Sequence, residues 1–457
     1  MTLIKSISGF RGTIGPTPGE DLTPLDAVKF TASFAAFLQE KNKQRTIQVV
    51  VGRDARISGN MLQQLVMNTL VGMGIKVIDA GLSTTPTVEW AVTETRSQGG
   101  IILTASHNPK EWNALKLLNE KGEFISANDG KEVLRRADAD DYAFASIDEL
   151  GSIEEGNFLK GHIQHILSLP TVDVEAIRAK NFKIAVDGIN SSGGVYVPAL
   201  LDALNVDVVP LNCRADGHFA HNPEPLAEHL TDICQLVVKE KCDLGIVVDP
   251  DVDRLAFVCN DGSLFGEEYT LVAIADYLLG IKPGPTVSNL SSSRALKVIT
   301  EKYGQRYEAA AVGEVNVVEK MKAIGAVIGG EGNGGVIYPE THYGRDALVG
   351  IALFLSHLAK QNTDVRAMRN GYPNFIMIKD KVQLSAALNV DQLLVDVTNA
   401  FQNEEVNTID GVKIDFKEGW VHLRKSNTEP IIRIYAEAEN LDIASDLISR
   451  VKSHLPA

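Results

Sequence analysis

The chain has 457 residues, of which 44% are hydrophobic and 23% charged, as in an ordinary globular protein of about three domains. Its formal net charge of −15 argues against nucleic acid and against an anionic membrane surface as partners. No apolar run reaches the roughly 18 residues of a membrane span, and the first residues lack a signal-peptide core. Because the four cysteines lack metal-ligand spacing, we expect buried free thiols in a cytoplasmic protein.

Short apolar segments alternate with helical patterns in the first third of the chain. Residues 48–51, 76–79 and 101–103 are predicted strands, and the segments between them are predicted helices. The third strand leads into residues 104–109, where a proline ends the strand and Ser106 is presented on a tight loop. Such a loop is typical of a turn or a helix cap, although its hydroxyl could also carry a covalent group.

The same pattern occurs twice more. Strands are predicted in a second unit at residues 183–187, 206–209 and 245–248, and in a third unit at 286–289, 309–312 and 326–328. The last strand of each unit ends in a chemically unusual loop, and ligand-binding loops of α/β folds lie at the carboxyl ends of strands. We therefore predict three related α/β domains with buried mixed sheets.

The pattern changes past about residue 369. Antiparallel strands are predicted at residues 375–378, 412–416, 420–424 and 431–437, and helices at 390–403 and 441–453. These elements predict a smaller α+β domain. We place the four domains at residues 1–155, 156–260, 261–369 and 370–457.

Three aspartates alternate in the loop after the last strand of the second unit. Asp249, Asp251 and Asp253 can converge on one point in a loop, although they would diverge on a helix. Crowded carboxylates raise one another's proton affinity unless a cation lies between them. Their all-oxygen ligand set favours Mg²⁺ or Ca²⁺ over zinc, and a solvated acidic turn is the alternative.

Two further loops carry groups that bind sugars and phosphates. Five glycines in residues 329–335 surround Glu331 and Asn333, whose carboxylate and amide could take paired hydrogen bonds from sugar hydroxyls. In the last domain, a turn dense in hydroxyl and guanidinium groups could hold a phosphate. Its candidate ligands are Arg424, Ser426, Thr428 and Arg433. Basic residues that could also bind an anion gather at Arg11, Arg53 and Arg56.

A carrier serine, a divalent cation, a hydroxyl-binding loop and a phosphate-binding turn together indicate phosphoryl transfer to and from a phosphorylated sugar. In these loops and their order, the chain resembles the α-D-phosphohexomutase superfamily over essentially its whole length. The resemblance implies a C-terminal domain of the TATA-binding-protein-like kind and four domains around a central cleft. It also implies Mg²⁺ as the metal and a hexose 1,6-bisphosphate as both intermediate and activator.

The resemblance also implies roles for individual residues. The implied catalytic residues are Ser106 as phosphoryl carrier, Lys116 as candidate general acid/base, Arg11 and His107. The implied metal ligands are Ser106, Asp249, Asp251 and Asp253. The implied substrate-binding residues are Arg254, Glu331, Asn333, Arg424, Ser426, Asn427, Thr428 and Arg433. We expect a small-molecule sugar phosphate as the partner, and a monomer or homodimer as the assembly.

Some positions depart from the usual pattern of the superfamily. Many members have Ser at the position of Asn333 and His at that of Gly335, for which His342 or Arg345 could substitute here. Glu314 stands where glucose- and mannose-specific branches often have His. An acidic residue near the sugar would favour an ammonium at C2, so we expect glucosamine phosphate as substrate. The alternatives are a mutase for mannose or glucose phosphate, a catalytically silent sugar-phosphate sensor, and a phosphatase.

Overall fold

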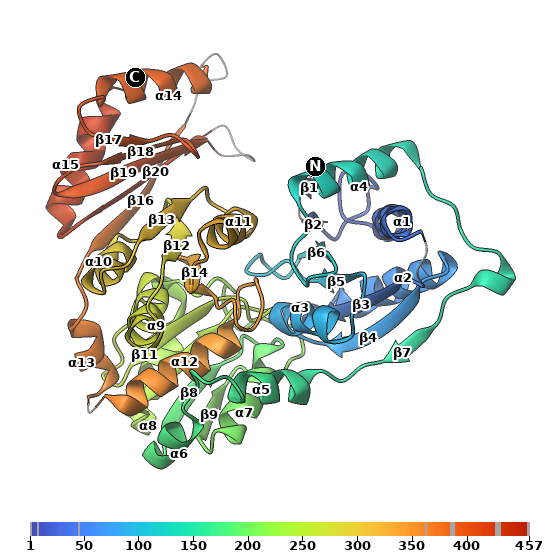
Figure 1. The fold of residues 1–457 in the computed structure, drawn as a ribbon, viewed down its shortest axis with the longest axis horizontal. Coiled ribbons are helices and arrows are strands. Elements are labelled where there is room, and N and C mark those ends of the chain that lie inside the picture. Colours follow the sequence, from blue (N-terminus) through green and yellow to red (C-terminus); the bar gives the residue numbers. More distant parts are fainter. Residues whose placement is uncertain are drawn as a thin grey trace.

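Four β-sheets organise the chain in the computed structural model, which describes residues 2–6, 9–43, 46–361, 363–383, 389–425 and 431–454. In Figure 1 the blue N-terminal unit lies on the right, the red C-terminal sheet lies at the upper left, and the green and yellow units lie below that sheet. The predicted fold class is confirmed, because three α/β units with mixed sheets precede an α+β unit. The domain boundaries stay a prediction.

The first unit is built on a seven-stranded mixed sheet in the order β1-β2-β6-β5-β3-β4-β7. Its strands are β1 (Ile4–Ser6), β2 (Gly9–Thr13), β3 (Gln48–Arg53), β4 (Lys76–Leu82), β5 (Gly99–Leu103), β6 (Trp112–Leu118) and β7 (Ile153–Glu155). Its helices are α1 (Pro24–Lys41), α2 (Gly59–Gly72), α3 (Thr85–Glu94) and α4 (Ala127–Ala139). The three predicted strands are β3, β4 and β5, which run parallel because helices return the chain between them. The unpredicted β6 pairs antiparallel with β5, so the serine loop connects a hairpin.

The second and third units repeat this arrangement with four-stranded sheets in the orders β11-β10-β8-β9 and β13-β12-β14-β15. The second contains α5 (Leu159–Leu167), α6 (Val174–Lys180), β8 (Lys183–Asp187), α7 (Gly193–Ala203), β9 (Asp207–Leu211), α8 (Thr231–Glu240), β10 (Leu244–Val248) and β11 (Leu255–Cys259). The third contains α9 (Glu267–Ile281), β12 (Thr286–Asn289), α10 (Ala295–Lys302), β13 (Tyr307–Ala310), α11 (Glu314–Ile324), β14 (Ile328–Glu331), β15 (Gly335–Ile337), α12 (Ala347–Lys360) and α13 (Val365–Asn370). In each unit, the unusual loop joins an inner strand to an antiparallel neighbour. Glu331 is the last residue of β14 and not part of the loop, which corrects its predicted place.

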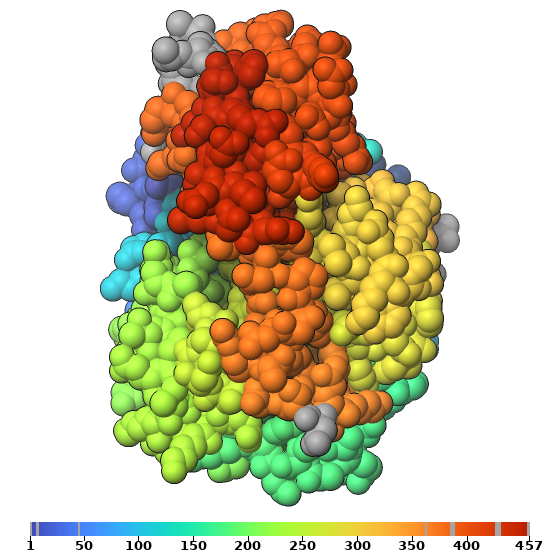
Figure 2. Space-filling view, turned by 90° about the vertical axis from the view of Figure 1, so that its left-hand side faces the viewer, coloured from blue at the N-terminus to red at the C-terminus, as the bar shows by residue number. Residues whose placement is uncertain are grey.

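The second and third units share one hydrophobic core. Helix α12, which is buried along almost its whole length, packs against α5 and α6 of the second unit and α9 of the third. The ring of Phe354 on α12 stacks on Phe257 of β11 with centroids 3.9 Å apart. Figure 2 shows the orange segment that contains α12 and α13 running up between the green and yellow units to the red C-terminal unit. This shared core sets the relative position of the two loops.

The C-terminal unit is a five-stranded antiparallel sheet in the order β16-β20-β19-β18-β17. Its elements are β16 (Ile376–Gln383), α14 (Val390–Ala400), β17 (Glu405–Asn407), β18 (Val412–Asp415), β19 (Gly419–Lys425), β20 (Ile431–Ala438) and α15 (Leu441–Lys452). Val397 of α14 and Leu447 of α15 are fully buried in the core that these helices form with the sheet. The predicted α+β arrangement is therefore confirmed.

Two general expectations can be compared with the fold. None of the described helices is long and apolar enough to cross a membrane. The four cysteines are free thiols, and Cys242 and Cys259 are buried as expected. Cys213 and Cys234 are only half-buried, which corrects the expectation. Cys213 follows the edge strand β9, and Cys234 lies on the partly solvated helix α8.

Candidate active site

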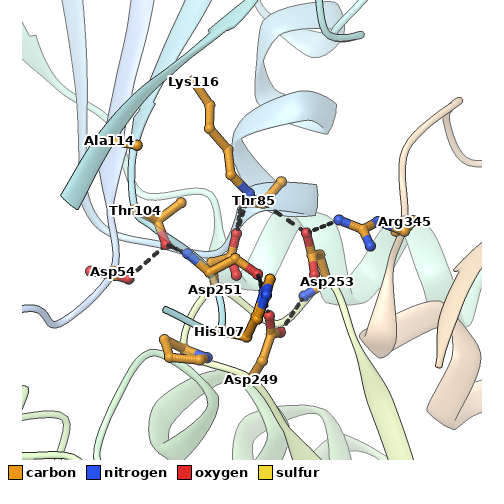
Figure 3. A network of polar contacts seen from close by, with 12 residues as sticks. Asp54, Thr85, Thr104, His107, Ala114, Lys116, Asp249, Asp251, Asp253 and Arg345 are labelled. Atoms are coloured by element: carbon orange, nitrogen blue, oxygen red, sulfur yellow. Dashed lines mark hydrogen bonds and ion pairs between the residues drawn. The ribbon is translucent and has the colours of Figure 1, made fainter. Parts of the chain in front are cut away.

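Ser106 lies in the hairpin loop with a left-handed backbone, at φ 49°. Its N–H donates to Thr104 Oγ1 over 2.9 Å. The Thr104 hydroxyl donates in turn to Asp54 Oδ2 over 2.6 Å (Figure 3). A left-handed conformation is unfavourable for a residue with a Cβ, so the surrounding contacts must hold it. The Ser106 hydroxyl donates to Asp249 Oδ2 over 2.6 Å. The serine of the first unit therefore faces the acidic loop of the second.

Arg56 holds the serine loop in place. Its guanidinium uses all five N–H donors: Nε donates to Asp54 Oδ2 over 3.0 Å, and the others donate to loop carbonyls. The carbonyls belong to Ser106, Asn108, Pro109 and Trp112. The side chains of Arg56 and Asp54 are completely buried. The expectation that Arg53 and Arg56 could bind an anion is therefore corrected, since Arg53 likewise donates to Gln63 and to the Asp54 carbonyl.

Asp249, Asp251 and Asp253 converge as predicted. One carboxylate oxygen of each lies within 4.8 Å of the others, and all three residues are fully buried. Burial and the two neighbouring carboxylates raise the pKa of Asp249 well above its usual range. We call these residues the acidic triad.

Cations from two other parts of the chain contact the acidic triad (Figure 3). Lys116 Nζ on β6 lies 2.7 Å from Asp251 Oδ2 and 3.6 Å from Asp253 Oδ2. Arg345 donates to Asp253 Oδ2 over 2.7 Å, and the Thr85 hydroxyl donates to Asp251 Oδ2 over 2.6 Å. Burial opposes ionisation of Asp251, but the ammonium of Lys116 outweighs it and lowers the pKa of Asp251 below its usual range. Burial likewise disfavours the charged ammonium, but Asp251 and Asp253 raise the pKa of Lys116.

The acidic triad is chemically suited to a small hard cation. The Oδ1 atoms of Asp251 and Asp253 are buried and have no hydrogen-bond partner among the described residues. Leaving such oxygens unpaired is unfavourable, and a divalent cation with oxygen ligands would satisfy them. Among the described residues, this ligand group consists of carboxylates and contains no imidazole or thiolate. Such an all-oxygen set favours Mg²⁺ or Ca²⁺.

A cavity of about 310 Å³ is lined by residues from all four units. The predicted site residues in its lining are His107, Arg254, Glu331, Asn333, Arg424 and Arg433. The lining residues that were not predicted are Glu224, Glu267, Glu268, Asn289, Ser291, Val312, Gly332, Lys379 and Tyr435. The cavity is the central cleft that the resemblance implies.

Arg11 and His107, two predicted catalytic residues, contact the serine loop and Arg254 respectively. Arg11 donates to Asn108 Oδ1 in the serine loop over 3.3 Å, and burial lowers its pKa. His107 Nε2 lies 3.5 Å from an Arg254 nitrogen. Burial, followed by the charges of Arg254, Arg345 and Arg11, lowers the pKa of His107 to about 2, so its ring is neutral. The predicted Ser426, Asn427 and Thr428 lie outside the described residues.

Arg424 and Arg433 lie directly opposite each other on the neighbouring strands β19 and β20. Like charges in this position are unfavourable unless an anion lies near them. Arg424 Nε lies 2.8 Å from Asp410 Oδ2, and both arginines line the cavity. The pair therefore favours an anionic ligand at this end of the cavity.

Arg345 connects the acidic triad to the sugar-binding residues that we predict. Besides Asp253, its guanidinium donates to Glu314 Oε2 and to Glu331 Oε2, each over 3.0 Å. Glu331 Oε1 accepts from Asn289 over 2.9 Å. Arg345 and Asn289 thus hold the Glu331 carboxylate from both sides. Burial alone would raise the pKa of Glu331, but the charge of Arg345 outweighs this effect and lowers the pKa.

Of the two candidates for the histidine missing at Gly335, the structure places Arg345 there. A Cβ at Gly335 would lie 2.3 Å from Arg345 Cδ, so the glycine leaves the space that the arginine occupies. His342 lies elsewhere, 3.2 Å from Glu89 and 3.3 Å from Asp346. The space beside Gly335 is thus occupied by an arginine from the segment before α12.

Among the described residues that line the cavity, Glu268 on α9 is the carboxylate without an ion-pair partner. Glu314 pairs with Arg345 and does not line the cavity. The other cavity carboxylates have ion-pair partners: Glu224 with Arg254, Glu267 with Lys379, and Glu331 with Arg345. Glu268 has none among the described residues, although it accepts the Ser293 N–H over 2.8 Å. Burial raises its pKa well above the usual range, which favours the neutral acid until a cation lies beside it. Its position at the start of a helix is common for acidic residues, so the sequence offered no signal for it.

The comparisons with known proteins agree with this fold and site. Residues 4–143, 160–262 and 266–375 match the families described as phosphoglucomutase/phosphomannomutase, alpha/beta/alpha domains I, II and III, and residues 379–453 match the C-terminal domain of the same series. The chain therefore belongs to the phosphoglucomutase/phosphomannomutase family. It is a phosphohexomutase, and thus an isomerase.

Individual relatives cover almost the whole chain. A phosphoglucomutase/phosphomannomutase from Thermococcus kodakarensis is 33% identical over 94% of both chains. A phosphoglucosamine/phosphogalactosamine mutase from Sulfurisphaera tokodaii is 31% identical over 99% of both. The crystal structure of a phosphoglucomutase/phosphomannomutase family protein from Burkholderia thailandensis is 26% identical over 99% of both chains, with a TM-score of 0.86.

Proposed function

We propose that the enzyme interconverts the 1- and 6-phosphates of a hexose through phosphorylated Ser106, with a hexose 1,6-bisphosphate as intermediate and activator. The hydrogen bond from Ser106 Oγ to Asp249 Oδ2 is the observation that carries this proposal. It joins a hydroxyl on one unit to an acidic triad on another, and His107 and Arg254 from these same loops line the cavity. A hydroxyl in that position can exchange a phosphoryl group with a sugar bound in the cavity.

The proposed transfer breaks the bond between phosphorus and Ser106 Oγ and forms a bond between phosphorus and a sugar oxygen. One proton must leave the sugar hydroxyl, and one must return to Ser106 Oγ. Lys116 Nζ, which contacts the acidic triad, is the proposed general acid/base on the sugar side: as the neutral amine it would take the proton of the sugar hydroxyl, and as the ammonium it would return one when the sugar oxygen leaves. Asp249 Oδ2, which accepts from the Ser106 hydroxyl, orients the serine oxygen. The reverse step uses the other phosphate of the bisphosphate after the sugar has turned over in the cavity.

Asp249, Asp251 and Asp253, with an oxygen of the phosphorylated serine, are the proposed ligands of Mg²⁺. When bound, this ion would neutralise charge on the transferring phosphoryl group. Arg424 and Arg433 are proposed to hold whichever phosphate does not react, together with Ser426, Asn427 and Thr428. Guanidinium groups recognise phosphate without regard to the carbon that bears it. The same residues can therefore hold the unreactive phosphate in both half-reactions.

Asp251→Asn is expected to raise the Mg²⁺ concentration for half-maximal activity by about 100-fold, because it removes one anionic ligand from the triad. Mutase assays across a Mg²⁺ titration measure this. Asp276→Asn changes a carboxylate on α9 outside the cavity and serves as the control. Unchanged Mg²⁺ dependence in Asp251→Asn would remove this aspartate from the metal site.

We propose glucosamine phosphate as the preferred substrate, so that the enzyme is a phosphoglucosamine mutase. Glu268 supports this, since a carboxylate in the cavity without an ion-pair partner among the described residues suits an ammonium at C2. The name of the Sulfurisphaera tokodaii relative points the same way. The name of the Thermococcus kodakarensis relative supports the alternative, a phosphomannomutase/phosphoglucomutase. We further propose a cytoplasmic monomer or homodimer.

The substrate is tested by comparing kcat/KM for glucosamine, glucose, mannose and N-acetylglucosamine phosphates, each with its own bisphosphate as activator. A preference for glucosamine phosphate is the expected result. Higher kcat/KM for glucose or mannose phosphate would establish the alternative. Turnover of none of them, with intact binding of sugar phosphates, would indicate the silent sensor.

Glu268→Gln is expected to lower kcat/KM for glucosamine phosphate by about 10- to 100-fold, as loss of a charged hydrogen bond predicts. Glucose phosphate, which has no ammonium, should change by less than about threefold. Glu267→Gln, on the neighbouring residue paired with Lys379, is the matched control and should affect both sugars equally. Equal losses of kcat/KM for the two sugars in Glu268→Gln would show that Glu268 does not recognise the substituent at C2.

A further inference from the structure

A second buried polar cluster shares no residue with the acidic triad. It consists of His162 on α5, His342 and Asp346 just before α12, and Glu89 on α3. These side chains are at most 2% exposed. They belong to the first, second and third units, and the proposed mechanism uses none of them.

The two imidazoles converge on one oxygen atom. Asp346 Oδ2 lies 3.2 Å from His162 Nε2 and 3.3 Å from His342 Nε2. Asp346 Oδ1 is turned the other way and accepts the backbone N–H groups of Leu348 and Val349 at the start of α12. The carboxylate is therefore fixed by the helix cap and presents its second oxygen to both rings.

The far side of each imidazole also has a partner. Thr87 Oγ1 lies 2.9 Å from His162 Nδ1, and Glu89 Oε2 lies 3.2 Å from His342 Nδ1. Metal-bound histidines in proteins usually contact a hydroxyl, carbonyl or carboxylate through the second ring nitrogen. A Cβ at position 344 would lie 1.9 Å from Glu89 Oε2, so Gly344 leaves the space for this carboxylate.

His342 Nε2 and Asp346 Oδ2 form a hydrogen bond, but other atoms of the cluster lack partners. His162 Nε2 is buried and, among the described residues, has no partner with hydrogen-bond geometry. The same holds for His342 Nδ1 and both oxygens of Glu89. Buried polar atoms without partners are rare and unfavourable, and a bound ion would compensate for this at His162.

We propose that His162 Nε2, His342 Nε2 and Asp346 Oδ2 bind one divalent transition-metal ion of the zinc class. Tetrahedral ligands at the usual distances from zinc, about 2.0–2.2 Å, lie about 3.4 Å from one another, close to the separations observed here. Two imidazoles and one carboxylate favour such an ion over Mg²⁺, which the all-oxygen acidic triad favours instead. The two sites thus differ in ligand chemistry.

The position of the cluster indicates a structural role for this ion. His162 belongs to the second unit, Asp346 begins the central helix α12, and Glu89 belongs to the first unit. Thr85, four residues before Glu89 on α3, contacts Asp251 of the acidic triad. An ion at this junction would therefore hold the first unit, which carries Ser106, against the second unit, which carries the acidic triad.

Binding is tested on the full-length protein after chelation, with excess Mg²⁺ present to occupy the acidic triad. Addition of Co²⁺ should produce the visible bands of a tetrahedral site at one equivalent, and Zn²⁺ should abolish them. Bound zinc should also raise the melting temperature in the absence of substrate.

His162→Gln and His342→Gln are expected to weaken Co²⁺ binding by at least about 100-fold. His357→Gln removes another buried histidine, whose Nδ1 contacts the Ala273 carbonyl and whose Nε2 contacts Gln361, and this variant should bind Co²⁺ normally. Asp251→Asn should also bind normally, which separates this site from the acidic triad. If a histidine variant does not fold, the Co²⁺ titration of the unaltered protein still decides the question.

Two results would overturn the proposal. One is the lack of a tetrahedral Co²⁺ spectrum in the unaltered protein, and the other is an unchanged spectrum in both histidine variants. Without an ion, burial opposes protonation of His342, but Asp346 and Glu89 raise its pKa to about 10. A melting temperature that falls as the pH approaches 10 and does not respond to Zn²⁺ would therefore identify a proton-linked ion pair in place of a metal site.

Discussion

Ser106→Ala is expected to lower mutase activity by at least about 1,000-fold, because it removes the oxygen that is proposed to carry the phosphoryl group. The Ser106 hydroxyl is 2.6 Å from Asp249 Oδ2, and the rest of the loop is held through Arg56 and Thr104. Loss of one hydroxyl should therefore leave the fold and the cavity intact. The measurements are mutase turnover and transfer of labelled phosphate from hexose 1,6-bisphosphate to the protein.

Ser449→Ala is the matched control for this prediction. It makes the same chemical change on an exposed position of α15, where the hydroxyl donates to the Ser445 carbonyl of its own helix. Label should appear on the unaltered protein and on this control, and be absent from Ser106→Ala. Appreciable turnover or labelling in Ser106→Ala would assign the carrier role to another group.

Arg56→Met is expected to destabilise the first unit by about 3–5 kcal/mol, because it leaves the Asp54 carboxylate buried without its ion-pair partner. It also removes the guanidinium hydrogen bonds to four carbonyls of residues 106–112. Since Ser106 is oriented by that loop, activity should fall by at least about 100-fold even in protein that remains folded. Thermal unfolding, amide exchange of the loop and mutase assays measure the three effects.

Two further variants make this prediction specific. Arg53→Met removes a neighbouring arginine that contacts Gln63 and the Asp54 carbonyl, and it should cost no more than about 1.5 kcal/mol per lost hydrogen bond. Asp54→Leu combined with Arg56→Met removes the uncompensated charge, so it should recover part of the stability but none of the activity. Wild-type activity in Arg56→Met would show that the loop keeps its shape without the arginine.

Several parts of the site followed from local sequence patterns. The serine loop comes directly after the predicted buried strand β5, and the acidic triad comes directly after β10. The position of each at the carboxyl end of a strand in its own sheet was therefore predictable. The antiparallel strand after each loop was not predicted. Its signal is weak, because a fully buried strand has no polar-apolar alternation; β11, for example, is buried at every residue.

Other parts depend on contacts between distant segments. Thr85 and Asp251 are 166 positions apart, and Arg345 and Asp253 are 92 apart. Arg345 belongs to no motif, and its place beside Gly335 depends on how the segment before α12 packs. Glu268 was not predicted, and neither was the ion pair of Glu314 with Arg345, since only the packed structure shows which carboxylate already has a cation.

The sequence by itself determined the four units, the order of their loops and the class of chemistry, because strand patterns and loop compositions are local properties of the chain. Only the tertiary structure decided which side chains meet. The shared core around α12 positions the second and third units, and the contacts of Ser106, Lys116 and Thr85 with the acidic triad join the first unit to them. Charge pairing across these contacts leaves Glu268 without an ion-pair partner among the described residues and brings His162, His342 and Asp346 together, since electrostatic partners are set by distance in space and not by spacing in the chain.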